Sequence, residues 1–188
     1  MKKIILLAAV ALLNTAVFAQ SWKVNKAHSH FTFTITHLAV SDVDGVFKDF
    51  DATITASKPD FSDAKVEFVA QTASLNTSED KRDGHLKSPD FFDVAKYPTV
   101  SFTSTSIKAT SANHYKVTGN LTLTGVTKVV TFDFVHRGTI AGPNGPDAGF
   151  SVTGTINRSD YKFGTKFGAP LLSDEVTFKA SGEFDKVN

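Results

Sequence analysis

The stretch His30-Phe31-Thr32-Phe33-Thr34-Ile35-Thr36-His37 alternates between hydroxyl-bearing residues and mostly apolar ones. Successive side chains of a β-strand point to opposite faces, so Phe31, Phe33, Ile35 and His37 share one face and the threonines share the other. This period of two predicts a strand with one buried face and one hydroxylated face.

The same alternation recurs along the chain and extends the prediction to a whole fold. Turn signals separate the alternating runs, and no helical runs stand between strands as parallel sheets require. We therefore predict an all-β fold of about eight antiparallel strands, either an up-and-down barrel or a sandwich. The Gly138–Gly149 stretch, rich in glycine and proline, is expected to be an exposed loop. The further alternating runs are residues 64–71, 100–102, 121–124, 131–136 and 176–180.

One segment, from Arg82 to Pro98, breaks the strand pattern by mixing charge, histidine and paired aromatic residues. Ser88 followed by Pro89 and Asp90 is typical of a helix start, and Pro98 should end that helix. We predict a short helical excursion around residues 78–97. It would present Phe91 and Phe92 as a lid or plug on the barrel, and is a candidate gate.

The first 19 residues are predicted to be a secretory signal peptide. Lys2 and Lys3 form its basic start, Ile4–Leu13 its apolar run, and Val17-Phe18-Ala19 its cleavage site. Residues 20–188 then form a single domain that is periplasmic or secreted.

Charge and composition limit the kinds of partner that the protein is expected to have. Lys2 and Lys3 are two of the 20 basic residues, so the chain from Gln20 carries 18 basic and 19 acidic residues, scattered along it. This balance is against nucleic acid as a partner and against electrostatic docking on membranes. No apolar run reaches the roughly 20 residues that span a bilayer, and there is no cysteine to carry a lipid or form disulfides. We expect no stable membrane insertion.

Several stretches carry a family resemblance. Arg82-Asp-Gly-His-Leu-Lys-Ser-Pro-Asp-Phe-Phe-Asp93, with Tyr97-Pro98, resembles the hallmark segment of the YceI-like proteins, a bacterial family of periplasmic, lipocalin-like polyisoprenoid binders. The segments 27–37, 43–50, 119–127 and 157–164 resemble other elements of that family in the same order. The resemblance covers nearly all of the chain after the signal peptide and implies an antiparallel eight-stranded lipocalin-like barrel rather than a sandwich.

The resemblance also implies a ligand. Seventeen phenylalanines stand against one tryptophan and three tyrosines, so most aromatic surface has no polar group. Residue types alone favour a filled interior, whereas the resemblance favours an apolar tunnel that holds an isoprenoid, quinone or fatty chain. The expected wall consists of Phe31, Phe33, Ile35, Val66, Phe68, Phe102, Leu121, Leu123, Phe132, Phe134 and Phe178. Phe91, Phe92, Phe163 and Phe167 would lie at or near an end.

Polar residues could bind a lipid head group or stabilise the fold. Arg82 and His85, with Asp83, could receive a polar lipid head, or Arg82 and Asp83 could instead tie the excursion to neighbouring strands. Arg158 and Asp160 are expected to be a structural pair. His28 and His30 should share a strand face, with His37 on the other, so no metal site and no cofactor is expected.

We expect a binding protein rather than an enzyme, since no catalytic motif is present. Two other classes stay open: an envelope enzyme or metal-binding protein, and a ligand-free stress or interaction protein with a filled barrel. The protein is expected to be a monomer or a homodimer.

Overall fold

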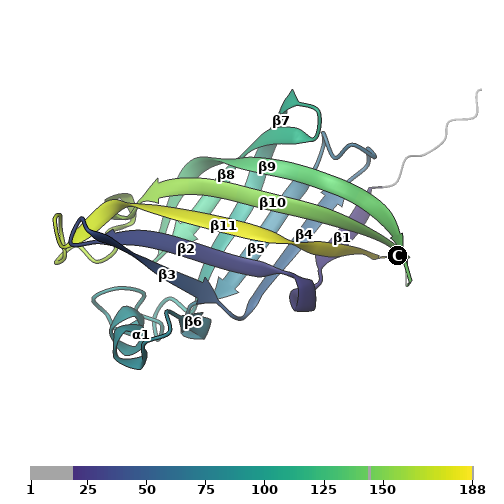
Figure 1. The fold of residues 1–188 in the computed structure, drawn as a ribbon. Helices are drawn as coiled ribbons and strands as arrows, with labels where there is room; N and C mark the ends of the chain where they lie inside the picture. Colours follow the sequence, from purple (N-terminus) through teal and green to yellow (C-terminus); the bar gives the residue numbers. More distant parts are fainter. Residues whose placement is uncertain (1–18, 144, 188) are drawn as a thin grey trace, which may run out of the picture.

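Strands at eight positions close into an antiparallel barrel in the computed structural model, which describes residues 19–143 and 145–187 (Figure 1). The closed ring runs in the order β1-β4-β5-β7-β8-β9-β10-β11, and β11 pairs back with β1. The predicted eight-stranded barrel with a short helical excursion is confirmed. The predicted signal peptide, apart from Ala19, lies outside the described residues.

The strands are β1 (Gln20–Val24), β2 (His30–His37), β3 (Ser41–Phe47), β4 (Phe50–Ala56), β5 (Lys65–Gln71), β6 (Leu75–Asn76), β7 (Thr99–Ser111), β8 (His114–Leu123), β9 (Val126–Gly142), β10 (Gly145–Asn157) and β11 (Leu172–Val187). The helices are η1 (Lys26–His28), η2 (Thr72–Ser74), α1 (Asp80–Lys87) and η3 (Arg158–Tyr161).

Two positions of the barrel wall are each shared by two strands in sequence. Along β11, residues 172–181 pair with β2 and residues 184–187 pair with β1, so β1 and β2 lie end to end. The short helix η1 marks the break between them. In the next position of the wall, β3 pairs with β2 and β4 pairs with β1.

The wall is therefore split on one side. β4 continues the barrel through β5 to β7, whereas β3 pairs with the two-residue strand β6. Residues 72–98, which we call the plug segment, contain β6 and α1 and lie beside β3 at this end of the barrel (Figure 1). Because the wall is split here, another element must cover the core at this place, and the plug segment lies where it can do so.

The helix of the plug segment ends where we predicted that it would begin. Glu79 caps α1, because its carboxylate accepts hydrogen bonds from the N–H groups of Lys81 (3.1 Å) and Arg82 (2.5 Å). Ser88 follows the helix with extended angles, φ −74° and ψ 170°. A residue before proline is disfavoured in the helical region, so Pro89 ends α1 rather than beginning a helix.

The predicted loop from Gly138 to Gly149 is also wrong. The strands β9 and β10 continue through it as a hairpin, with Gly142 opposite Gly145 and a bulge between Gly149 and Phe150. Gly138 and Gly145 have φ of 137° and 136°, values that glycine adopts readily. Glycine and proline therefore shape this hairpin without interrupting its ladder.

Candidate functional site

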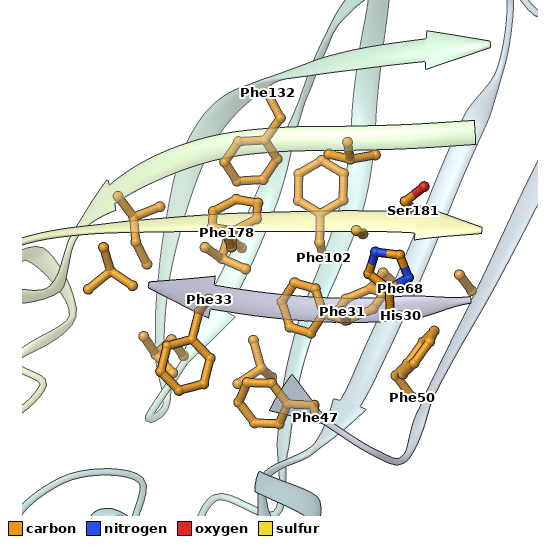
Figure 2. A pocket seen from close by; sticks show the side chains of 18 of the residues that line it. His30, Phe31, Phe33, Phe47, Phe50, Phe68, Phe102, Phe132, Phe178 and Ser181 are labelled. Carbon is orange, nitrogen blue, oxygen red and sulfur yellow. The ribbon is translucent and has the colours of Figure 1, made fainter. Parts of the chain in front are cut away.

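The interior of the barrel is hollow. A cavity of about 280 Å³ runs between the strands and the plug segment, and its lining is almost entirely apolar. Figure 2 shows phenylalanine rings from several strands facing this space. The alternation seen in the sequence is the cause: on β11, Val176, Phe178, Ala180, Gly182 and Phe184 line the cavity.

Most of the predicted wall lies together in the structure. The cavity is lined by Phe31, Phe33, Ile35, Val66, Phe68, Arg82, Phe91, Phe92, Phe102, Leu121, Leu123, Phe132, Phe134, Phe163 and Phe178. The sequence reasoning did not name several further lining residues, although their alternation within strands was a usable signal. These include Phe47, Phe50, Ile54, Val100, Val117, Phe150, Val152 and Phe184.

Two glycines make room for aromatic rings in the wall. A Cβ atom on Gly45 would lie 2.2 Å from the ring of Phe33, and one on Gly154 would lie 2.3 Å from the ring of Phe132. Real Cβ atoms do not approach ring carbons this closely, so any other residue would displace those rings. These glycines let Phe33 and Phe132 lie close against neighbouring strands.

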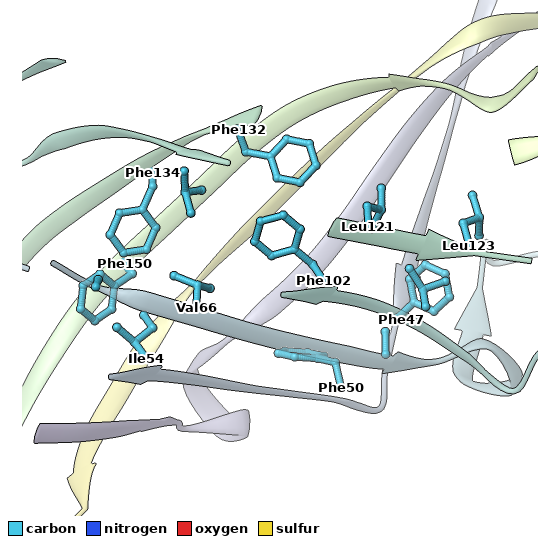
Figure 3. Packing of buried hydrophobic residues seen from close by; sticks show 14 of the residues in the cluster. Phe47, Phe50, Ile54, Val66, Phe102, Leu121, Leu123, Phe132, Phe134 and Phe150 are labelled. Carbon is cyan, nitrogen blue, oxygen red and sulfur yellow. The ribbon is translucent and has the colours of Figure 1, made fainter. Parts of the chain in front are cut away.

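Aromatic rings also pack against one another across the barrel. Phe31 meets Phe68 edge to face with centroids 4.7 Å apart, and Phe132 meets Phe178 in the same way at 4.6 Å. Figure 3 shows how Phe102 and Phe132 approach each other inside the barrel. The wall is thus partly fixed by ring contacts, which contribute about 0.5–1.5 kcal/mol each beyond apolar burial.

The barrel end remote from the plug segment is filled by Trp22, Phe61 and His136, which do not line the cavity. Phe61, from the loop between β4 and β5, packs edge on against Trp22 at 5.5 Å and Phe150 at 4.8 Å. The ring of His136 lies 4.5 Å from that of Phe61, and burial lowers the pKa of this histidine. This end is closed by a neutral, mainly aromatic cluster.

At the plug segment, Arg82 and Asp83 both bind Thr77. Arg82 donates from Nε to the Thr77 hydroxyl (2.8 Å) and from Nη2 to the Thr77 carbonyl (2.7 Å). Asp83 accepts from the Thr77 N–H (2.8 Å) and hydroxyl (2.5 Å). Burial raises the pKa of Asp83, but the Thr77 hydrogen bonds outweigh it, so the net pKa lies below its ordinary value. The pair braces α1 against the residues after β6.

Arg82 nevertheless also belongs to the cavity. Its side chain lines the wall, and within the described chain its Nη1 atom makes no hydrogen bond. The two roles that the sequence left open for Arg82 are therefore compatible: two of its nitrogens brace α1, and the residue also borders the cavity.

Arg158 has a different role from the one expected. Asp160 is not its partner; the buried guanidinium, only 4% exposed, donates to backbone carbonyls. Its Nε reaches Ser173 (2.8 Å), its Nη1 reaches Phe163 (3.0 Å) and Gly164 (2.8 Å), and its Nη2 reaches Phe167 and Leu172. These contacts use all five N–H donors and hold loop 162–171 across the barrel end.

His85 and Phe167, both predicted ligand contacts, do not line the cavity. Their rings pack edge on at 5.3 Å, and Nε2 of His85 lies 3.6 Å from a carboxylate oxygen of Asp90. Asp90 also binds the ammonium of Lys166 at 2.5 Å. These residues join the plug segment to loop 162–171 on the outer side of the barrel end.

The histidines near the start of β2 are arranged differently from the prediction. His28 lies on η1 rather than on the strand, and its Nδ1 is 3.2 Å from a carboxylate oxygen of Glu183. His30 lines the cavity near Ser181 (Figure 2). Within residues 19–143 and 145–187, no three histidine, aspartate or glutamate side chains are grouped as metal ligands would be. Nor, in that same part of the chain, does any helix have the length and apolar character to cross a bilayer.

This combination of barrel, plug segment and apolar cavity agrees with the sequence comparison. The model of the YceI-like domain matches residues 22–184. The chain belongs to the YceI-like family. Within that family, Protein YceI of Salmonella newport (strain SL254) is 37% identical over 179 residues, which cover 94% of this chain and 93% of that protein.

Solved structures show the same family fold. The Campylobacter jejuni YCEI protein is 35% identical, with a TM-score of 0.72 over 81% of this chain and 90% of that one. A more distant likeness, at 16% identity, supports the fold alone. It is to a polyisoprenoid binding domain from Saccharophagus degradans, with a TM-score of 0.66 over 89% of this chain and 98% of that one.

Proposed function

We propose that this protein is a noncatalytic lipid carrier that holds a long apolar isoprenoid, quinone or fatty chain inside its barrel. The observation that carries the proposal is the continuous apolar cavity, which extends from the plug segment past Phe31 and Phe68 toward Phe150. An interior of this kind suits a hydrocarbon chain, because burial of each CH₂ contributes about 0.8 kcal/mol without any directional partner.

Polar groups are few and lie at particular places in the wall. Arg82 at the plug segment has an Nη1 atom that makes no hydrogen bond with the described residues, and His30, Ser151 and Ser181 line the cavity farther along β2, β10 and β11. A guanidinium suits the oxygen atoms of a lipid head group. We infer that the chain is bound by apolar contact and that Arg82 contributes to head-group preference.

Two further considerations support the proposal. The Saccharophagus domain of similar fold is described as polyisoprenoid binding. The first 19 residues have the pattern of a cleaved export signal, which would place the carrier in the periplasm or outside the cell, where a long apolar chain needs shielding from water. Export and carriage therefore belong together in this proposal.

Native mass spectrometry of the protein purified after export tests both parts. We expect a stoichiometric adduct that organic extraction releases as a polyprenyl, quinone or acyl compound. We also expect a polypeptide mass that corresponds to cleavage after Ala19. A protein that is ligand-free, and stays so after incubation with quinones, polyprenyl compounds and fatty acids, would contradict the carrier function.

A further inference from the structure

Two uncharged loops meet at one end of the barrel and expose apolar side chains there. The first is the β2–β3 turn, Leu38-Ala39-Val40, and the second is Ala169-Pro170-Leu171, just before β11. All six residues are exposed; Leu38 is 50% exposed and Val40 82%. The Leu38 N–H donates to the Leu171 carbonyl at 2.9 Å, so the loops are in direct contact. We call these six residues the apolar tip.

The backbone of the β2–β3 turn does not favour the residues that it carries. Leu38 and Ala39 have φ of 53° and 56°, in the left-handed region, and the Val40 N–H closes the turn on the His37 carbonyl at 3.2 Å. A hairpin turn with two such residues prefers asparagine and glycine, because side chains other than these are strained there. A leucine that is both strained and exposed brings no advantage to folding, which indicates another role.

The apolar tip lies next to the cavity. His37 and Leu172 are paired across β2 and β11 directly behind the tip, and both line the cavity. The two loops lie side by side at the left end of the barrel in Figure 1. The other large exposed apolar residues of the described chain are Val129 and Ile140 on β9 and Val187 on β11. Three of the six large exposed apolar residues of the described chain, Leu38, Val40 and Leu171, thus lie next to residues that line the cavity.

We propose that the apolar tip docks reversibly on the surface of a lipid bilayer, so that a bound chain passes between membrane and cavity; this last step rests on the proposed carrier function. Two loop tips of three residues each are far smaller than the roughly 20–30 residues per side of a standard protein interface, but they suit shallow entry among lipid head groups. The tip has no charge, and both signs occur close by, at Asp42 and Lys166. Docking should therefore depend on apolar insertion rather than on anionic lipid.

Vesicle sedimentation tests the docking directly. The wild-type protein should sediment with phosphatidylcholine vesicles, and adding phosphatidylglycerol or salt should change this little. The tip variant Leu38→Asn, Ala39→Gly, Val40→Ser, Leu171→Ser should bind the same vesicles at least about tenfold more weakly, because it loses the apolar side chains that insert. Its thermal midpoint should be unchanged or higher, because asparagine and glycine suit the left-handed turn.

The control removes two exposed apolar side chains of β9. Val129→Ser with Ile140→Ser changes residues that are 70% and 69% exposed and should leave vesicle binding unchanged. Wild-type protein that does not sediment with either vesicle, or equal loss in the tip and control variants, would overturn the docking. A dimer that forms through the tip without vesicle binding would also overturn it and identify a second copy as the occupant.

A soluble probe separates docking from the carrier function. A fluorescent fatty acid below its critical micelle concentration should bind wild type and tip variant with equal affinity, because the substituted residues do not line the cavity. Its transfer from vesicles to protein should be slower for the tip variant. If the probe binds neither protein, the carrier function is contradicted, while the sedimentation result still decides the docking.

Discussion

The rings of Phe91 and Phe167 lie almost parallel, with centroids 5.0 Å apart and planes at 11°. Phe91 belongs to the plug segment and lines the cavity, whereas Phe167 belongs to loop 162–171 and lies outside it. Within the described residues, no strand pairing connects the plug segment with loop 162–171. The ring contact and the Asp90–Lys166 ion pair therefore help to hold this end of the barrel together. Side-chain contacts can open without breaking the barrel.

The plug segment is accordingly expected to control ligand exchange. Phe91→Ala with Phe92→Ala should speed both uptake and release of a fluorescent fatty acid, measured by stopped flow well below the unfolding temperature. Phe61→Ala is the control, since it removes one buried ring at the opposite, closed end. Each buried Phe→Ala change should lower the unfolding free energy by about 3–5 kcal/mol. Exchange rates that change equally in both variants would attribute the effect to general destabilisation.

The cavity can be filled without touching the plug segment. Ala180 lines the cavity on β11, opposite Phe31 of β2, so Ala180→Phe should occupy ligand space and weaken chain binding at least about tenfold. Lys179→Phe places the same ring on the outer face of the same strand and should leave binding unchanged. Titration with a fluorescent fatty acid compares the two. Full affinity in Ala180→Phe would show that the chain binds elsewhere.

Arg158 should be needed to shape loop 162–171. Lysine has a single ammonium in place of the planar fork, so Arg158→Lys cannot reach all five carbonyls and should cost about 3 kcal/mol of unfolding free energy. Hydrogen exchange should become faster in loop 162–171 than elsewhere in the chain. The exposed Arg137→Lys is the control and should change neither quantity. Uniformly faster exchange over the whole barrel would argue against a local role.

Asp83 should contribute to sensitivity to acid. Its folded-state pKa is lowered, so its stabilising effect is complete above the unfolded pKa of about 3.9 and is lost as pH falls through the folded value. Asp83→Asn should therefore lower the unfolding free energy by about 2 kcal/mol near pH 7, and the deficit should shrink below about pH 4. Urea unfolding at several pH values measures this. Asp51→Asn, at an exposed position of β4, is the control, and a deficit that does not change with pH would contradict the assignment.

The strands and most of the wall could be predicted because alternation has a direct physical meaning, whereas the choice of a barrel over a sandwich came from the family resemblance. Once Phe31, Phe33 and Ile35 are on one face of a strand, burial of that face places them inside, and the same holds for Leu121 and Leu123. His85 and Phe167 were harder to place. Their types suit a ligand site, but only the packing of the plug segment against loop 162–171 shows that they lie outside it.

The wrong predictions for the start of the helix and for the β9–β10 hairpin have the same origin. Ser88-Pro89-Asp90 is compatible with a helix start, but Glu79 capped an earlier helix, and the proline then ended it. Glycine and proline between Gly138 and Gly149 are compatible with a loop, but β9 and β10 pair with each other as antiparallel strands there. Local signals of this kind are compatible with more than one secondary structure, and hydrogen bonds to other residues determine which one forms.

The sequence by itself determined most of the strand pattern and the apolar character of the interior, because these depend on which side chains avoid water and on the period-two geometry of a strand. Only the tertiary structure decided that the interior is hollow, that the plug segment fills a split in the wall, and that Leu38 and Leu171 meet at one exposed tip. These features depend on how rings and loops distant in sequence pack in space, and no short-range pattern encodes that packing.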